Sequence, residues 1–537
     1  MSSTDMAESL HQGLTTPNGH FYQQPLGLFI DNQFVLASAV APITAVDPAT
    51  EEVIASVEAA TADDVDRAVK SAKRALKSDS WRLLSGTERG KLLLRLADLM
   101  ESQKHILASV VSWENGLPFT SALGEDVAGA IDAIRYFGGW ADKVGGQSIS
   151  PTPQKLAYTL RQPIGVVGQI IPWNSPLMMA GWKLGPALAC GNTVVLKAAE
   201  QTPLCILLLA QLIQEAGFPP GVVNLLNGRG SEAGVALVQH PIVDKIAFTG
   251  SAITARSVMS LASKTLKNIT LETGGKSPLL IFRDADLNQA AKWAQIGIMA
   301  YSGQICTSTS RILVEKDIYP SFLALFKKVI NELSIVGDPW NDSSFQGPQA
   351  SKAQFNRVMS YIEQGKAEGA HLLIGGSPCP IKGKGYYIQP TIFTDVEPSM
   401  TIYREEIFGP VVIGKGYYIQ PTIFTDVEPS MTIYQEEIFG PVVIVCPFDN
   451  EEDAIAQAND TTYGLGASVF TTDLERAHRV AAEIEAGMVW VNSSQDCDFR
   501  IPFGGVKQSG IGRELGEAGL EAYTQVKAIH INLGTVL

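Results

Sequence analysis

Apolar runs alternate with amphipathic stretches through the middle of the chain, and this alternation limits the possible folds more than any other feature. Helical stretches begin at Thr202-Pro203, where Gly217 closes the helix, at Ser231 and near 255–263. Strands that alternate with helices of this length predict an α/β fold with a mostly parallel sheet, which binds ligands at the carboxyl ends of its strands. The expected strands are 166–171, 193–196, 222–226, 245–248 and 269–271.

Two more helices are expected before this region. Thr61, which is followed by two aspartates, is typical of a helix N-cap, and apolar residues recur at helical spacing as far as Leu76. The second helix covers about 87–103. Residues 1–26 mix small and polar residues without a clear period, so we expect a loose N-terminal tail.

Composition and charge exclude several classes of protein. The 537 residues, 45% hydrophobic and 18% charged, are enough for more than one core, and the net charge of -14 argues against a nucleic-acid partner. The longest apolar stretches, such as 204–210, are too short for a membrane span, and no signal segment is recognisable. We therefore expect a cytoplasmic protein with neither membrane nor nucleic acid as a partner.

The number and spacing of cysteines and histidines limit the kinds of reactive or metal site that the chain can form. The six cysteines, which include Cys306 and Cys497, are never within four residues of one another, so CxxC metal or redox sites are not expected. The 7 histidines form no ligand cluster in the sequence. We expect chemistry at one thiol and no metal.

A 31-residue segment occurs twice in tandem. Residues 383–413 are repeated as 414–444 with a single change, Arg404 to Gln435. Two copies are too few for a solenoid, so the repeat predicts a tandem duplication inside a single-copy fold. We expect the surplus copy to extend from loops, where insertions cost little closure entropy, and to expose apolar residues such as Tyr387 and Phe393.

Two glycine-rich segments give weak signals. The segment Gly228 to Gly234 has one residue too many for a dinucleotide fingerprint. Gly275-Lys276-Ser277 resembles the end of a phosphate loop, but Thr270 occupies the position of the required first glycine. Hydrolysis of nucleoside triphosphates is therefore disfavoured.

Three polar residues stand out at the ends of expected elements. Cys306 follows a helical stretch at 288–300, and a lone cysteine is most often a small buried hydrophobe. Glu272 ends an expected strand, where a solvated charge is the commoner case. Asn174 also ends a strand, and its ordinary role there is to form a turn. Taken singly, none of the three indicates a catalytic site.

Together, however, their segments match one family pattern. From about residue 27 to the C-terminus the chain resembles the NAD(P)-dependent aldehyde dehydrogenase superfamily. The matching motifs, in the family's order, are PWNSPL, GNTVVLKAAEQTP, KIAFTGS, LETGGKSP, GQICTSTSR, EEIFGP and PFGGVKQSGIGRELG. The resemblance implies that Cys306 is the nucleophile, Glu272 the general base and Asn174 an oxyanion-hole donor.

The expected reaction requires these residue types. An aldehyde releases hydride readily only after a nucleophile has made its carbon tetrahedral, and a thiolate does this and then holds the acyl group as a thioester. An amide N–H from Asn174 stabilises the oxyanion by about 3 kcal/mol. Glu272 then activates the water that cleaves the thioester.

The resemblance also implies the cofactor site. Lys197 and Glu200 match the residues that hold the adenosine ribose, and a carboxylate there favours NAD over NADP, because it repels a 2′-phosphate. Departures from the family pattern are Ala198, Thr273 and Ala255, the last at a usual glycine. The other implied cofactor-binding residues are Ile170, Pro172, Trp173, Gly230, Gly250, Ser251, Glu437 and Phe439.

The implied substrate pocket departs from that of many relatives. Ser175 and Cys497 occupy positions that are often aromatic, whereas Met179, Trp182 and Phe503 keep an apolar lining. We expect a tunnel that is wider and less aromatic near the thiol. The sequence does not indicate which aldehyde is the substrate.

The resemblance implies an aldehyde dehydrogenase fold with a Rossmann-like cofactor domain, an α/β catalytic domain and a small β bridging element for oligomerisation. A homodimer or homotetramer is expected on the same basis. We expect the second repeat copy, through Glu437 and Phe439, to occupy the site. The alternative is a non-catalytic protein that keeps the fold, with an activity impaired by the duplication. The expected boundaries are 27–145 and 164–274 for the cofactor domain, 275–512 for the catalytic domain, and 146–163 and 513–537 for the bridging element.

Overall fold

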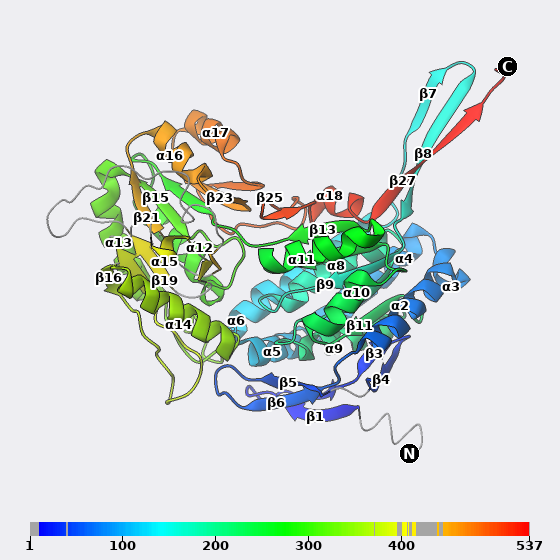
Figure 1. Ribbon diagram of the computed structural model, residues 1–537, viewed down its shortest axis with the longest axis horizontal. Helices are drawn as coiled ribbons and strands as arrows, with labels where there is room; N and C mark the ends of the chain where they lie inside the picture. Colours follow the sequence, from blue (N-terminus) through cyan, green and yellow to red (C-terminus); the bar gives the residue numbers. More distant parts are fainter. Residues whose placement is uncertain are drawn as a thin grey trace.

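The computed structural model describes residues 10–38, 41–369, 371–394, 400–404, 406–407, 411–414, 438–439 and 444–535. Two α/β lobes lie side by side, and a β arm projects from one of them (Figure 1). The last described strand of the chain runs out along this arm, on the opposite side of the body from the first strands. Each lobe is built around its own eight-stranded sheet.

The sheet of the first lobe contains every strand expected between 166 and 271. Strands β9 to β13 run parallel, and short antiparallel strands close both edges. All five parallel strands therefore present their carboxyl ends at one edge. The strand order is β26 (Gly510–Ile511), β13 (Asn268–Glu272), β12 (Lys245–Thr249), β9 (Val166–Ile170), β10 (Thr193–Lys197), β11 (Val223–Leu226), β3 (Leu28–Ile30) and β4 (Gln33–Val35).

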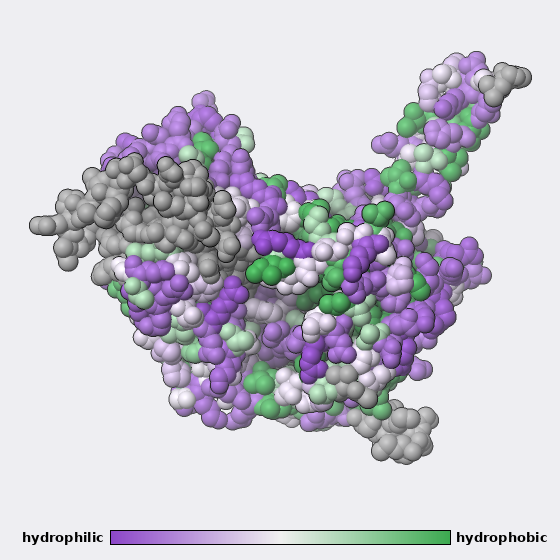
Figure 2. All heavy atoms as spheres, in the orientation of Figure 1, coloured by the Kyte–Doolittle hydropathy of each residue, from purple (hydrophilic) through white to green (hydrophobic). Residues whose placement is uncertain are grey.

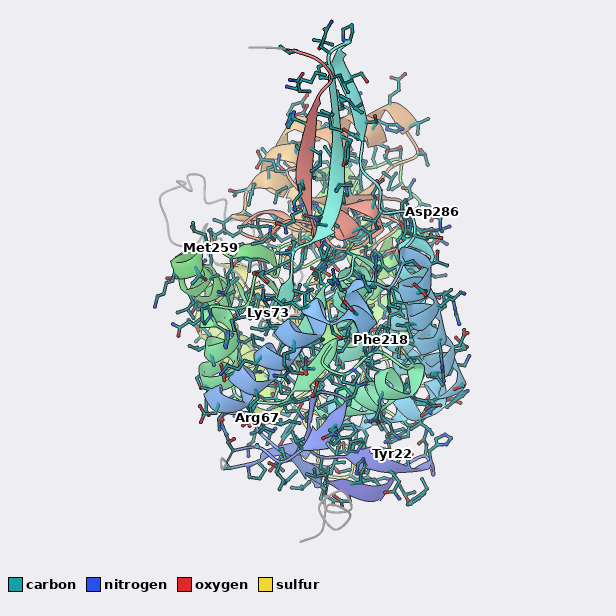
Figure 3. All side chains as sticks on the ribbon, turned by 90° about the vertical axis from the view of Figure 1, so that its right-hand side faces the viewer. Tyr22, Arg67, Lys73, Phe218, Met259 and Asp286 are labelled. Atoms are coloured by element: carbon teal, nitrogen blue, oxygen red, sulfur yellow. The ribbon has the colours of Figure 1, made fainter. Side chains whose placement is uncertain are left out.

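Helices cover both faces of this sheet, and each face has its own apolar core. One face packs against α2 (Ala62–Lys77), α10 (Val235–Gln239) and α11 (Ala252–Ala262). On the other face lie α8 (Pro176–Ala189) and α9 (Leu204–Ala216), outside which pack α4 (Gly86–Ser102), α5 (Lys104–Asn115) and α7 (Ala128–Trp140). Figure 3 shows Arg67 and Lys73 along the outer side of α2.

Local sequence signals set the helix ends. Thr61 caps α2 in a capping box with Asp64, as the sequence predicts. Gly217 ends α9 with φ +89°, a conformation that glycine adopts without steric cost. The helix expected from Ser231 begins instead as a π-helical turn, Gly230–Gly234, before α10.

The prediction of a loose tail over residues 1–26 is wrong for the part that the structure describes. β1 (His11–Thr15) and β2 (Phe21–Pro25) form an antiparallel hairpin, with Leu14 and Tyr22 buried in the core of the first lobe. Tyr22 lies at the base of the body in Figure 3. This hairpin packs against α9 through β2, so burial of alternate side chains holds the segment in place. β5 (Ile43–Val46) pairs with β6 (Val53–Val57) in a separate antiparallel hairpin.

The second lobe also has helices on both faces of its sheet. One face packs against α12 (Leu287–Met299) and α13 (Tyr319–Leu333), the other against α14 (Lys352–Ala367), α16 (Glu451–Asn459) and α17 (Leu474–Glu483). The strand order is β16 (His371–Ile374), β17 (Thr391–Thr394), β19 (Val411–Gly414), β21 (Ile444–Phe448), β15 (Arg311–Glu315), β14 (Pro278–Ile281), β23 (Gly466–Phe470) and β24 (Met488–Val491).

The first repeat copy contributes strands to the sheet, which corrects the expectation that residues 383–413 extend from loops; residues 415–437 of the second copy lie outside the described residues. β17 and β19 of the first copy are inside the sheet, and Ile413 pairs with Ile444, its equivalent in the second copy. Most of the apolar side chains expected to be exposed are instead buried: Tyr387, Ile388 and Phe393 are at most 2% exposed, and Tyr386 is half-buried. β18 (Glu406–Ile407) pairs with β20 (Ile438–Phe439). β21 is described from Ile444 onward.

The arm consists of β7 (Ser148–Thr152), β8 (Lys155–Pro163) and β27 (Thr524–Asn532). Its surface mixes polar and apolar side chains (Figure 2), and Ile149, Leu160 and Val526 are exposed.

Two predicted domain boundaries need correction. β26 lies before the expected limit of the catalytic domain at 512 but pairs in the first sheet, and α18 (Gly516–Glu521) contacts α8 and so is not confined to the arm.

Candidate active site

A cavity of about 990 Å³ lies between the lobes and collects most of the residues that the sequence singles out. Its wall contains all three expected catalytic residues, Cys306, Glu272 and Asn174. The other expected residues in the wall are Pro172, Trp173, Ser175, Met179, Trp182, Gly250, Ser251, Cys497 and Phe503. Segments far apart in the sequence therefore form one chamber.

Cys306 lies on a tightly held loop after α12. Tyr301 and Ser302 both adopt left-handed backbone conformations, with φ of +55° and +53°, which are uncommon for residues other than glycine. Hydrogen bonds hold this conformation: the Ser302 hydroxyl donates to Gly347 O at 2.9 Å, and Ala350 N donates to Oε1 of Gln304 at 3.0 Å. Strain fixed in this way is typical of functional sites.

The thiol of Cys306 is not acidic in this environment. Burial, together with the Glu272 carboxyl and Cys497, raises its pKa to about 12, while the backbone N–H groups of Cys306 and Thr307 act in the opposite direction. Because a thiolate is the nucleophile, a base must take the thiol proton. Glu272 is the carboxyl that interacts with this thiol.

Glu272, the last residue of β13, is buried, and neither of its carboxyl oxygens has a hydrogen-bond partner among the described residues. Burial raises its pKa well above 4.5, and the nearby Glu514 adds to the effect. Gly504 adopts φ +149°, and a side chain there would come within 2.7 Å of the Glu272 carboxyl. The glycine therefore leaves room for this carboxyl to move, as a base requires.

Thr273, which follows Glu272, departs from the family pattern, and in the structure it forms hydrogen bonds. The Thr273 hydroxyl donates to Gln508 O at 2.6 Å, and its backbone N–H donates to Ser509 O at 3.0 Å. These bonds join the end of β13 to the loop between β25 (Val506–Lys507) and β26.

Asn174 is placed by the turn between β9 and α8. Its Nδ2 donates to Gln304 O at 2.8 Å, which orients the amide and leaves one N–H for another acceptor. Asn115 supports the same turn by donating to Trp173 O at 2.6 Å. The turn and the Cys306 loop are thus bonded directly to each other.

Sequence reasoning missed a buried ion pair behind Glu272. Nζ of Lys183 on α8 donates to Oε1 of Glu514, and both side chains are almost completely buried. Glu514 raises and Lys183 lowers the pKa of Glu272. A separation of 331 residues left no local signal for this pair.

The expected cofactor residues follow the carboxyl ends of adjacent strands. Glu200 follows β10, and its Oε1 accepts the N–H of Gly230 at 2.8 Å. Lys197 is buried, and burial lowers its pKa to about 8 although Glu200 opposes the shift. Gly250 and Ser251 precede α11, which Ser251 caps. Ile170, Lys197, Glu200 and Gly230 lie at this edge but outside the cavity wall.

Two expected residues of the second repeat copy are not placed. Glu437 lies outside the described residues, and Phe439 is described only as backbone of β20. Two arginines that the sequence reasoning missed, Arg256 on α11 and Arg357 on α14, line the cavity instead. Arg256 comes from α11 at the expected cofactor edge and Arg357 from the second lobe, and both can bind an anionic ligand in the cavity.

The chain has two α/β lobes, a β arm, and a chamber between the lobes with a thiol, a carboxyl and an amide in its wall. The sequence profile of the aldehyde dehydrogenase family matches residues 34–413 and again 413–529. The chain belongs to the aldehyde dehydrogenase family.

Known proteins resemble the chain over nearly its whole length. An aldehyde dehydrogenase of Aspergillus niger is 48% identical over 98% of both chains. "Aldehyde dehydrogenase [NAD(P)+] 1" of Saccharomyces cerevisiae is 46% identical, over 95% of this chain and 96% of its own length. The solved NAD+ complex of the Bacillus cereus aldehyde dehydrogenase is 43% identical, with a TM-score of 0.87 over 95% of this chain and 97% of its own.

Neither a membrane span nor a metal site was found in the parts of the chain that the structure describes. No helix there is long and apolar enough to cross a membrane. No group of three or more histidine, cysteine, aspartate or glutamate side chains is placed there to hold a metal ion.

Proposed function

We propose that the protein oxidises an aldehyde to the carboxylic acid with NAD, through covalent intermediates on Cys306. The observation that carries this proposal is the presence of Cys306, Glu272 and Asn174 in the wall of one cavity. The first supplies a nucleophile, the second a base and the third a hydrogen-bond donor, which are the groups that aldehyde oxidation needs.

Cys306 begins the reaction. Its sulfur bonds to the carbonyl carbon, the carbonyl electron pair moves to oxygen, and the thiol proton passes to a base. When the oxyanion collapses, hydride leaves the carbon and a thioester remains on the sulfur. NAD, when bound, supplies the acceptor for this hydride.

Asn174 stabilises the oxyanion. Its second Nδ2 hydrogen is available because the first is bonded to Gln304 O. An oriented donor of this kind contributes about 3 kcal/mol, because it meets the charge only as the charge develops. The Cys306 backbone N–H is the proposed second donor.

Glu272 completes the cycle. Its buried carboxyl, without a hydrogen-bond partner among the described residues, takes a proton from water, which attacks the thioester carbon. The carboxylic acid leaves as the sulfur regains a proton. The raised pKa of Glu272, caused first by burial, makes it a stronger base than an exposed glutamate.

The cofactor edge fits an anionic dinucleotide. Thr249, Gly250 and Ser251 line the cavity at the start of α11, and Oγ1 of Thr249 has no hydrogen-bond partner among the described residues. A helix N-terminus favours phosphate, and Arg256 and Arg357 add positive charge. We assign the adenosine ribose to Lys197 and Glu200, so NAD is preferred to NADP, and the other contacts to Ile170, Pro172, Trp173, Gly230 and the Glu437–Phe439 segment.

We assign the expected homodimer or homotetramer contact to the arm. Ile149, Leu160 and Val526 are exposed there, and β27 and β7 are open edge strands. Exposed edges with apolar side chains favour pairing with a second chain. Sedimentation of the purified protein checks this, since a monomer at micromolar concentration contradicts it.

The test of the function is the appearance of NADH with a panel of aliphatic, aromatic and polar aldehydes. NADP serves as the control cofactor. Turnover of at least one aldehyde with NAD is expected. Folded protein that oxidises none of the panel favours instead a non-catalytic protein that keeps the fold.

A further inference from the structure

The aldehyde side of the cavity has one wall made by a single helical face. Gly124, Glu125, Ala128, Gly129 and Asp132 all line the cavity. Their spacing of three and four residues places them on one side of a helix. The first two belong to a π-helical turn, Ala122–Val127, which continues into α7. Such turns are frequent at functional sites, because they re-aim the side chains.

The middle of this wall is open. A side chain added at Gly124 would meet nothing within 4 Å, so empty space lies in front of that residue. At Gly129 it would meet only the end of Met178, with Sδ at 2.9 Å. The wall therefore leaves room for a branched or bulky group beside Gly124, whereas Met178 fills the space at Gly129.

Polar groups continue this wall from the catalytic turn outward. The Tyr301 hydroxyl lies near the side chains of both Glu125 and Ser175, which both influence its pKa. Ser175 directly follows Asn174, at a position where an aromatic residue is common in the family. Ser175, Tyr301 and Glu125 thus form a row of polar side chains that begins next to Asn174. Asp132 lies about 10 Å further along the helix than Glu125.

Among the described residues, no cation forms an ion pair with Glu125 or Asp132 on this wall, although Arg135 interacts with Asp132 at longer range. Asp132 has no salt-bridge partner among the described residues, because the neighbouring Arg135 donates to Asp98 at 2.8 Å instead. Asp498 also lines the cavity, but Arg500 pairs with it through two hydrogen bonds of 2.8 and 2.6 Å. Asp126, next to Glu125, bonds to Leu177 N and Met178 N at the start of α8.

The cavity is therefore polarised. Its two lining arginines, Arg256 and Arg357, come from α11 and α14, whereas the unpaired carboxylate Asp132 and the carboxyl Glu125 come from α7 and the turn before it. A negative wall on a narrow path raises the local concentration of cations and disfavours anions. The two ends of the chamber thus suit ligands of opposite charge.

We infer that the preferred substrates are aldehydes with a bulky, positively charged tail, which Glu125 and Asp132 bind while the aldehyde group reaches Cys306. This inference rests on the proposed function and adds the substrate class to it. Discrimination follows from attraction of the ammonium group and from the space beside Gly124. A neutral tail of the same shape fits the space but gains nothing from the carboxylates.

The test compares two aldehydes of equal shape, 4-(trimethylammonio)butanal and its neutral carbon analogue 5,5-dimethylhexanal. For the unaltered protein we expect kcat/KM to be at least about tenfold higher for the cation at low ionic strength. Asp132→Asn and Glu125→Gln should each lower this ratio while leaving kcat/KM for the neutral aldehyde nearly unchanged. Asp63→Asn, an exposed carboxylate on α2 outside the cavity wall, is the matched control and should keep the ratio.

Each outcome decides the question. Equal kcat/KM for the two aldehydes, or a ratio that neither variant changes, overturns the inference and leaves the proposed function intact. Absence of NADH with both aldehydes and with the wider panel contradicts the proposed function itself. Asp132→Asn alters an exposed side chain, so it keeps the test valid if Glu125→Gln fails to fold. Gly124→Val should lower kcat/KM for both bulky aldehydes but spare acetaldehyde.

Discussion

Lys183 and Glu514 form an almost completely buried ion pair next to Glu272, the proposed general base. The lysine lowers and the second glutamate raises the pKa of Glu272, so the pair sets the strength of the base. An ion pair buried to this degree is costly when one partner is removed, because the other charge is left uncompensated.

Lys183→Met should therefore shift the acid limb of the pH–kcat profile to higher pH. Removing the lysine leaves Glu514 as a buried negative neighbour, which favours the protonated form of Glu272. The measurement is kcat against pH with a good aldehyde, compared with Lys183→Arg as the charge-conserving control. An unchanged acid limb in folded Lys183→Met would show that the ion pair does not act on the base.

Cys306→Ala should abolish oxidation while it leaves NAD binding largely intact, because the thiol joins the reaction and not the cofactor edge. Titration of the variant with NAD checks binding, and NADH production checks the reaction. Cys497→Ala is the matched control, since it removes the other cysteine of the cavity wall and should retain turnover. Retained turnover in Cys306→Ala would falsify the nucleophile assignment.

Glu272→Gln should give a burst of about one NADH per active site and then stall, since hydride transfer precedes the attack of water. The folded-state pKa of Glu272 is raised, so its ionised fraction, and with it thioester hydrolysis, grows as pH rises through a value above 4.5. Rapid mixing with aldehyde and NAD measures the burst. Loss of the burst itself would mean that Glu272 also takes the thiol proton. The raised pKa of Cys306 supports this role, because such a thiol needs a base.

The sequence predicted the elements whose signals are local. Strands of the first sheet are apolar runs between turns, and the cap at Thr61 and the end of α9 at Gly217 depend on one or two residues each. That Cys306, Glu272 and Asn174 lie in one site could be predicted only from the family resemblance. The strand and loop ends that carry them meet only because the two lobes pack together.

Non-local packing was beyond sequence reasoning. The hairpin of β1 and β2 was read as a tail because each strand has five residues and few apolar side chains, and its burial depends on α9. The π-helical turn that places Glu125 has no sequence period that distinguishes it from an α-helix. The repeat was expected to extend from loops, yet the first copy adds β19 to the sheet between β17 and β21.

Glu200→Ala should narrow the preference for NAD over NADP, by about tenfold, because it removes the charge that opposes a 2′-phosphate. The hydrogen bond from Gly230 N to Oε1 of Glu200 holds the carboxylate at the strand edge where this phosphate would lie. The ratio of kcat/KM for the two cofactors is the quantity to measure. Glu200→Gln separates charge from hydrogen bonding, and an unchanged ratio in both variants would remove Glu200 from the ribose site.

The last prediction concerns the two copies of EEIFGP. By resemblance, the glutamate of this motif holds the nicotinamide ribose, and Glu406 and Glu437 are its two representatives. β18 of the first copy and β20 of the second pair directly, so the two backbones lie about 4.8 Å apart. Both copies are therefore near the same place, and the neighbouring strands must decide between them.

The second copy leads into β21, which pairs with β15, whereas the first leads into β19, one strand further from β15. β15 follows the Cys306 loop, so the copy that enters beside it is the better placed for the nicotinamide side. We therefore expect Glu437→Gln to lower kcat about tenfold or more, because a misplaced cofactor ring loses its alignment with the substrate. Glu406→Gln is the matched variant and should be nearly silent, and the reverse pattern in the same kinetic assay would give the site to the first copy.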